Sequence, residues 1–381
     1  MQKPVPRQID SRSHGFTLLE LLIVIAIIAA LMGLTTYVMY NVGAQAERAS
    51  TKATLRKING LLRDRIEAFD RSYKGDIRRQ YVQRTIEILR ANTTVGTNLD
   101  PYYAVPDNAP SALLVTARKT AFRYYFPQRL ADLLIGDPDT QLTGVPDSLY
   151  IKLLGPVARQ QLVDEGTPTP TQAEVLARVT TNWANHDPDT ESSELLHYAL
   201  IRSGTFSASA VAADRFSQAE VTDTDGDGLP EFVDRWGEPL RFYRWPTRLV
   251  DQDGIAGVSD EERAIAKTHL RDLPAEPFLA GERDLASTDP DDPVGLINSF
   301  LADNPTWGLT SVINVTNYHD LDTYHAPLVV SAGVDGVMGL SEPYDTGSFG
   351  HLGFWDNTTT VKDAMFDNLT NRSSRAGGGG R

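Results

Sequence analysis

The longest uncharged, apolar stretch of the chain lies close to its N-terminus. Residues 14–40 read HGFTLLELLIVIAIIAALMGLTTYVMY, and no charged side chain follows Glu20 until Glu47. The 26 residues of Leu21–Ala46 are therefore uncharged. As an α-helix this segment would be roughly 39 Å long, which is enough to cross a bilayer core of about 30 Å. The pattern predicts a helix over 16–40 that is able to span a membrane.

A second periodic pattern follows. Beyond Glu47 apolar side chains recur at three- or four-residue steps, and charged residues occupy positions between them. The apolar positions are Leu55, Ile58, Leu62, Ile66 and Phe69. Such spacing places them on one face of an α-helix. We expect an amphipathic helical stalk over 41–91, with a stop near Gly75 and a second helix over 77–91.

The middle of the chain also predicts helices. Residues 92–215 are interpreted as a helical insertion whose patterns cover 111–135, 148–164, 171–186 and 191–203. The tail 372–381 reads RSSRAGGGGR and is expected to be disordered.

Composition agrees with an exported protein. The chain has no cysteine, which excludes disulfides and thiolate chemistry, and its net charge is −14. Residues 1–15 carry Lys3, Arg7 and Arg12 against Asp10. The remainder has a charge of about −16, which argues against nucleic-acid binding through a broad basic face. Basic residues before the apolar run place the N-terminus in the cytoplasm and the acidic body outside.

One acidic side chain, Glu20, interrupts the apolar run and requires an explanation. A lone charge inside a membrane segment costs on the order of 3 kcal/mol. Cleavage of the chain after Gly15 would give Phe16 a free α-amino group. The amino group of a neighbouring copy could then neutralise Glu20 in a medium of low dielectric constant. In this interpretation Glu20 sets the axial stagger between subunits.

The segment Gly15-Phe16-Thr17-Leu18-Leu19-Glu20 resembles the cleavage site of type IV prepilins and type II secretion pseudopilins. The resemblance implies that prepilin peptidase, a membrane enzyme, removes the leader 1–15 and methylates Phe16. It also implies that the helix 16–40 forms the core of a filament. The expected partners are copies of the chain or other pseudopilins, prepilin peptidase, the membrane and an inner-membrane assembly platform.

Two other interpretations explain part of the same segment. A plain membrane anchor accounts for the apolar run but not for the Gly15–Phe16 junction or for Glu20. A secretory signal peptide cut after Ala46 has the small-residue form of such sites. That peptide would be 46 residues long, with an apolar run longer than that of ordinary signal peptides.

An acidic loop at 223–234 carries the pattern of a calcium-binding loop. It reads DTDGDGLPEFVD, with acids at loop positions 1, 3, 5, 9 and 12 and a glycine at position 6. Alternate side chains can converge on one cation, the glycine permits a sharp turn, and position 7 offers its carbonyl. The predicted calcium ligands are Asp223, Asp225, Asp227, the Leu229 carbonyl, Glu231 and Asp234. The loop resembles those of thrombospondin type 3 and dockerin-like modules as much as an EF-hand. Calcium is expected to be structural, and a solvated acidic turn is the alternative.

Two later segments resemble the C-terminal sheet of the type II secretion major pseudopilin. They read DRWGEPLRFY at 234–243 and PLVVSAGVDG at 327–336. The resemblance implies a β-rich head over 216–371 and a second calcium site. The candidate ligands of that site are Ser331 and Asp335, which match the motif, and Glu342 and Asp345.

The chain exceeds the family pattern in two places. The helical block 92–215 and the segment 244–326 are extra to it. Within the second, the acidic stretch Asp251–Glu262 lacks the central glycine and is interpreted as a turn into a helix capped by Asp260. The predicted fold class is α+β: a long N-terminal helix packed on a C-terminal antiparallel sheet, with extra helical insertions.

Common enzyme motifs are missing from the chain, which has no Gly-x-Ser-x-Gly, no His-Glu-x-x-His and no phosphate loop. We therefore expect a structural subunit of a type II secretion-like pseudopilus and not an enzyme. Its precursor would cross the inner membrane once, with the head in the periplasm or outside, before assembly into a filament. A type IV pilin or minor pilin for adhesion, motility or DNA uptake is the alternative within the class. A membrane-tethered binding or hydrolytic head is the alternative from another class.

Overall fold

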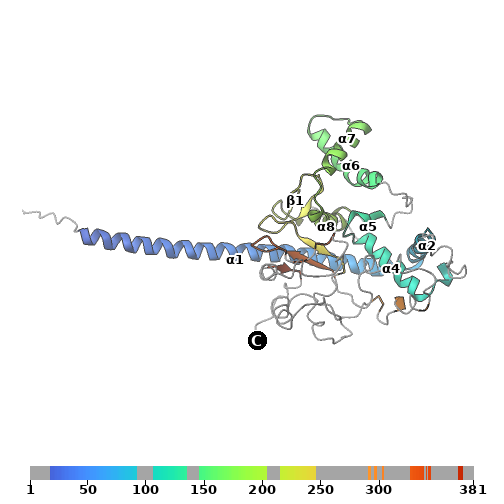
Figure 1. The fold of residues 1–381 in the computed structure, drawn as a ribbon, viewed down its shortest axis with the longest axis horizontal. Coiled ribbons are helices and arrows are strands. Elements are labelled where there is room, and N and C mark those ends of the chain that lie inside the picture. Colours follow the sequence, from blue (N-terminus) through green and yellow to red (C-terminus); the bar gives the residue numbers. More distant parts are fainter. Residues whose placement is uncertain are drawn as a thin grey trace, which may run out of the picture. The chain divides into compact units, whose positions relative to one another are not determined.

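The computed structural model describes several parts of the chain between Leu18 and Asn371. The described residues are 18–91, 106–134, 146–203, 215–245, 291–292, 296–297, 303, 327–338, 340, 342–344 and 368–371. They form an α+β fold that is mostly helical and contains two small antiparallel sheets (Figure 1). The leader 1–15, the tail 372–381 and the stretch Asp251–Glu262 lie outside the described residues.

The chain divides into two units, residues 1–47 and residues 48–381. The described residues of the first unit belong to helix α1, which runs over Leu18–Ser72 and so extends into the second unit. Apolar side chains of the first unit are exposed, as at Leu31, which is 58% exposed. Among the described residues no helix is both long and apolar enough to cross a membrane. The spanning role of residues 16–40 stays a prediction.

In the second unit α1 buries the face that the periodicity predicts. Leu55, Ile58, Leu62 and Phe69 are all buried. Helix α1 ends at Ser72, and α2 covers Gly75–Ala91. Gly75 has a φ of +53°, a left-handed conformation that glycine adopts without strain. The predicted stop near Gly75 is confirmed.

Short helices make up the described residues between 106 and 203. They are the 3-10 turn η1 (Pro106–Asn108), α4 (Ser111–Tyr125), α5 (Leu130–Leu134), α6 (Pro146–Asp164), α7 (Gln172–Trp183), α8 (Pro188–His197) and the π-helical turn η2 (Tyr198–Arg202). The structure corrects one sequence prediction. The helix expected over 111–135 is divided into α4 and α5, because Pro127 has no backbone N–H with which to continue a helix.

Helices α6 and α7 lie side by side as a hairpin (Figure 1). Thr171 caps α7, since its side chain accepts a hydrogen bond from the N–H of Glu174 while the Glu174 carboxylate accepts one from the N–H of Thr171. Such a capping box fixes the start of a helix. Helix α8 begins with Asp187 as its N-cap and Pro188 in its first turn, both favourable at those positions.

The two antiparallel sheets follow the helices. Strand β1 (Val221–Thr222) pairs with β2 (Glu231–Phe232) on either side of the acidic loop. The second sheet contains β3 (Arg241–Tyr243), β4 (Leu328–Ser331) and β5 (Leu369–Thr370). Its order is β3–β4–β5. Strand β4 is thus central, although long segments of chain separate it from both of its neighbours.

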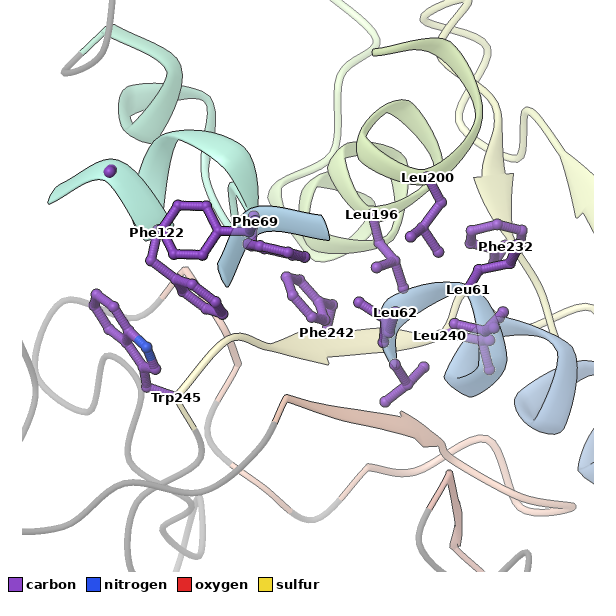
Figure 2. Packing of buried hydrophobic residues seen from close by; sticks show 14 of the residues in the cluster. Leu61, Leu62, Phe69, Phe122, Leu196, Leu200, Phe232, Leu240, Phe242 and Trp245 are labelled. Atoms are coloured by element: carbon purple, nitrogen blue, oxygen red, sulfur yellow. The ribbon is translucent and has the colours of Figure 1, made fainter. Parts of the chain in front are cut away.

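One hydrophobic core of the second unit joins α1, α2, α4, α8 and the second sheet. Figure 2 shows its aromatic centre. Phe69 of α1 meets Phe122 of α4 edge to face, with ring centres 5.4 Å apart. Phe122 in turn stacks on Trp245, with ring centres 6.0 Å apart. Burial of each large apolar side chain contributes about 1.5–3 kcal/mol relative to its exposure.

A fully buried carboxylate, Asp132, ties α4 and α5 to the end of β3. It accepts hydrogen bonds from Arg123 at 2.7 Å and from Arg244 at 2.6 Å, and its second oxygen also accepts from the backbone N–H of Gln128. Burial alone would raise the pKa of Asp132, but Arg244 and Arg123 hold it well below its usual range. Asp132 is therefore ionised in the folded protein at neutral pH.

Candidate functional site

The acidic loop folds around its own side chains. Asp223 accepts hydrogen bonds from the backbone N–H groups of two loop glycines at 2.9 and 3.0 Å. Asp225 Oδ1 accepts from the N–H of Asp227 at 3.0 Å, and Asp227 Oδ1 accepts from the N–H two residues later at 2.6 Å. One oxygen each of Asp225 and Asp227 remains directed to groups outside the loop.

The loop rests on the hairpin of α6 and α7. Gly228 has a φ of +92°, and a Cβ atom there would lie 3.0 Å from side-chain atoms of Asn182 and Val157. Both the backbone conformation and the close approach therefore require glycine. Leu229, whose carbonyl was predicted as a ligand, inserts its side chain among apolar residues of α6 and α7. The loop and the helical insertion thus form one packed structure.

Two side chains from outside the loop complete a cluster. His186 lies in the connection between α7 and α8, and its Nδ1 is 2.8 Å from Asp227 Oδ2 and 3.7 Å from Glu194 Oε2. The His186 ring stacks on Trp183 with ring centres 4.3 Å apart, which fixes its plane. One ligand atom from each of His186, Glu194, Asp225 and Asp227 lies within 4.8 Å of the others.

Two buried glutamates in and beside the loop, Glu194 and Glu231, each have one carboxylate oxygen that accepts no hydrogen bond in the described part of the chain. Glu194 is 1% exposed, and its Oε1 accepts from the Thr190 hydroxyl at 2.5 Å, while its Oε2 has no hydrogen-bond partner among the residues that the structure describes. Burial raises the pKa of Glu194 to about 10, and nearby Asp227 adds to the increase. Glu231 accepts from Thr224 through Oε1, and within the described ranges its Oε2 also has no hydrogen-bond partner. Burial raises the pKa of Glu231 to about 7. Such acids are stabilised by a proton or by a bound cation.

Asp234, the twelfth position of the predicted calcium loop, accepts hydrogen bonds from residues that follow the loop in the chain and from the second sheet. Its Oδ1 accepts from the N–H groups of Trp236 and Glu238 at 2.9 and 3.1 Å. Its Oδ2 accepts from the Ser331 hydroxyl at 2.7 Å. The structure therefore brings Asp234 together with Ser331, a residue that the sequence analysis assigned to the second calcium site.

The other residues predicted for the second site have separate partners. Asp335 Oδ1 accepts from the N–H of Val337 at 2.9 Å. Glu342 forms an ion pair with Arg241, with 2.5 Å between Oε2 and Nε. Asp345 lies outside the described residues. A calcium ion at this second site stays a prediction.

Sequence reasoning missed His186 and Glu194. His186 is 41 positions away from Asp227, a separation that matches no local metal motif. The signals near His186 are the cap at Asp187 and the proline after it, and these predict only the start of a helix. The packing of α6 and α7 against the loop brings the histidine to the acids.

The N-terminal processing residues Gly15 and Phe16 lie outside the described residues, and Glu20 lies in the first turn of α1. Residues 10–36 match the family model described as a prokaryotic N-terminal methylation motif. The methylation motif includes Gly15, Phe16 and Glu20, and it supports a type IV pilin-like protein that is anchored in a membrane and processed by prepilin peptidase. It is typical of structural proteins that assemble with other pilin subunits. Comparisons with curated proteins and with solved structures gave no match.

Proposed function

We propose that the chain is a structural subunit of a type II secretion-like pseudopilus. The match of residues 10–36 to the methylation motif is the observation that carries this proposal. Prepilin peptidase would cut after Gly15 and methylate Phe16. Glu20 would then accept the amino group of a neighbouring copy, so that both charges are neutralised in the filament core.

The exposed apolar surface of α1 supports assembly through this helix. Leu22, Ile25 and Leu31 are 60%, 57% and 58% exposed. Apolar surface in water costs about 25 cal/mol for each Å², so a chain gains free energy when such side chains contact lipid or other helices. Packing of this segment against copies of itself would supply that contact.

The second sheet supports a pseudopilin-like head. The two segments that resemble the major pseudopilin supply β3 and β4, which pair with Arg241 opposite Val330. We also propose that a divalent cation stiffens the acidic loop of this head. Calcium is the ion that the oxygen ligands of the loop favour when the loop is considered alone.

Processing can be tested on the protein isolated from its native membrane. Intact mass and N-terminal sequencing should give a chain that starts at Phe16 and carries one added methyl group. A start at Glu47 or an uncut Met1 would contradict the proposal.

Assembly can be tested with Glu20→Ala. The variant should be processed normally but should fail to enter filaments recovered from sheared cells, while Glu47→Ala should assemble. Loss of protein secretion in the Glu20→Ala strain would support the pseudopilus. Normal secretion together with lost motility or DNA uptake would favour the pilin alternative.

A further inference from the structure

Four potential metal ligands converge where the acidic loop meets the helical insertion. The loop supplies Asp225 and Asp227, whereas His186 and Glu194 come from the α7–α8 connection and from α8. One ligand atom of each lies within 4.8 Å of the others. Atoms that share one cation stand roughly 3–4.5 Å apart, so the cluster has nearly the size of a single metal site.

Glu194 gives an independent sign that a ligand belongs here. Its side chain is fully buried, its Oε2 lies 3.7 Å from His186 Nδ1, and no hydrogen-bond donor among the described residues reaches this oxygen. Buried polar atoms nearly always have a partner, and an unmet one requires an explanation. A cation between Glu194 and the loop acids would supply it.

Contacts from outside the loop position these acids, and His186 Nδ1 lies 2.8 Å from Asp227 Oδ2. Asp225 Oδ2 accepts from the N–H of Asp187 at 2.8 Å and lies 3.2 Å from the Thr190 hydroxyl oxygen. The shorter contacts of that hydroxyl are with Glu194 Oε1 at 2.5 Å and the carbonyl of Asp187 at 2.7 Å, and these two acceptors share its one hydrogen. These contacts orient the side chains, and a divalent cation would neutralise the carboxylates that bind it.

We propose that His186, Glu194, Asp225 and Asp227 bind one divalent transition-metal cation of the Mn²⁺ or Zn²⁺ class. The imidazole nitrogen distinguishes this site from a loop that binds calcium through oxygen alone, because imidazole suits transition metals and calcium takes oxygen ligands. The ion would fasten the helical insertion to the loop between β1 and β2.

The surroundings of the site fit a bound ion. The stacking of His186 on Trp183 holds the imidazole in place. Of the four proposed ligands, Glu194 also lines a cavity of about 180 Å³, together with His197 and Leu229 among others. This inference builds on the proposed cation site of the loop and is independent of filament assembly.

The test uses the full chain in detergent, stripped with a chelator and then titrated with MnCl₂, ZnCl₂ or CaCl₂ alone. Calorimetry should give one Mn²⁺ or Zn²⁺ per chain, with calcium bound at least about 10-fold more weakly. The metal should also raise the midpoint of thermal unfolding.

Matched variants locate the ligands. His186→Gln and Glu194→Gln should each weaken Mn²⁺ binding at least about 10-fold. Glu191→Gln is the control, because it makes the same substitution on the same helix. The Glu191 carboxylate accepts a hydrogen bond from the N–H of Leu130 and is not one of the four proposed ligands. Glu194→Gln should also raise the unfolding midpoint of the ion-free protein, since it removes a buried acid that lacks a donor. Spin-echo spectroscopy of bound Mn²⁺ should show coupling to a nitrogen nucleus, and His186→Gln should abolish it.

Three results would overturn the inference. Calcium binding that His186→Gln leaves unchanged would place the ion in the loop alone. Bound Mn²⁺ without nitrogen coupling would exclude His186 as a ligand. If none of the three ions binds, the loop has no site for a divalent cation. Each result leaves the processing at Gly15 unaffected, so a failed metal site and a failed pseudopilin assignment can be told apart.

Discussion

The hydroxyl of Ser331 donates a 2.7 Å hydrogen bond to Asp234 Oδ2, across 97 positions of the chain. Both residues are buried. The other oxygen of Asp234 accepts from the backbone N–H groups of Trp236 and Glu238. One carboxylate therefore holds the turn before β3 and the end of β4 together.

Ser331→Ala should lower the free energy of unfolding by about 1–3 kcal/mol, because it leaves a buried carboxylate oxygen without its donor. Urea unfolding measures the change. Ser50→Ala, at an exposed position of α1, should alter stability by less than about 0.5 kcal/mol. In a double-mutant cycle with Asp234→Asn the two losses should be less than additive. Additive losses would mean that the hydrogen bond contributes nothing.

Asp132→Asn should destabilise the second unit by about 3–5 kcal/mol, because it leaves the buried charges of Arg123 and Arg244 without their carboxylate. Asp70→Asn is a suitable control. Asp70 also pairs with an arginine of α4, Arg118 at 2.7 Å, but its side chain is 50% exposed. That pair is worth about 0–1 kcal/mol, so equal losses for the two variants would contradict the interpretation.

Stability should fall in acid partly through Asp132. Arg123 of α4 and Arg244 after β3 face this carboxyl, together with the N–H groups of Gln128 and Arg129, and they hold its folded-state pKa below the unfolded value. The unfolded chain therefore takes up the proton first as the pH falls. The stability that Asp132 contributes is fully present above about pH 3.9, the pKa of an unfolded Asp, and it is lost as the pH falls from there toward the folded-state pKa. The difference in unfolding free energy between the wild type and Asp132→Asn should therefore shrink as the pH falls below about 3.9. A difference that stays constant over this pH range would show that protonation of Asp132 is not coupled to folding.

Thr171→Ala should weaken the start of α7 by about 1 kcal/mol, because it removes one half of the capping box. Thr181→Ala makes the same substitution later in α7, where the hydroxyl donates only to the carbonyl of Ala177. It should have little effect or stabilise the helix slightly. Hydrogen exchange of the α7 amides would separate the two, and equal exchange rates would argue against the cap.

Local patterns predicted much of the helical architecture. The spacing of Leu55, Ile58 and Leu62 indicated which face of α1 is buried, and glycine chemistry at Gly75 indicated where the helix stops. The break after Phe126 follows from Pro127 and was readable from the sequence, although the prediction ran a single helix through it. These features depend on residues within a few positions of one another.

The candidate metal cluster depends on long-range packing and could be predicted only in part. Asp225 and Asp227 carry a local loop pattern, but His186 reaches them because the hairpin of α6 and α7 closes on Gly228 and Leu229. Likewise, the pattern grouped Asp234 with the loop acids, whereas folding directs it to Ser331. A single sequence has no local signal for either pairing.

The central position of β4 makes completion of the second sheet a late event in the synthesis of the chain. Strand β5 supplies one of its two neighbours, and Asn371, which follows β5, donates a 2.9 Å hydrogen bond to Asn59 of α1, 312 positions earlier. At about 5–20 residues per second, the ribosome needs roughly 15–60 s to make the intervening chain. During that interval the buried face of α1 lacks its final partners. The second sheet can therefore close only after synthesis has reached Asn371, and until then the core around α1 is incomplete.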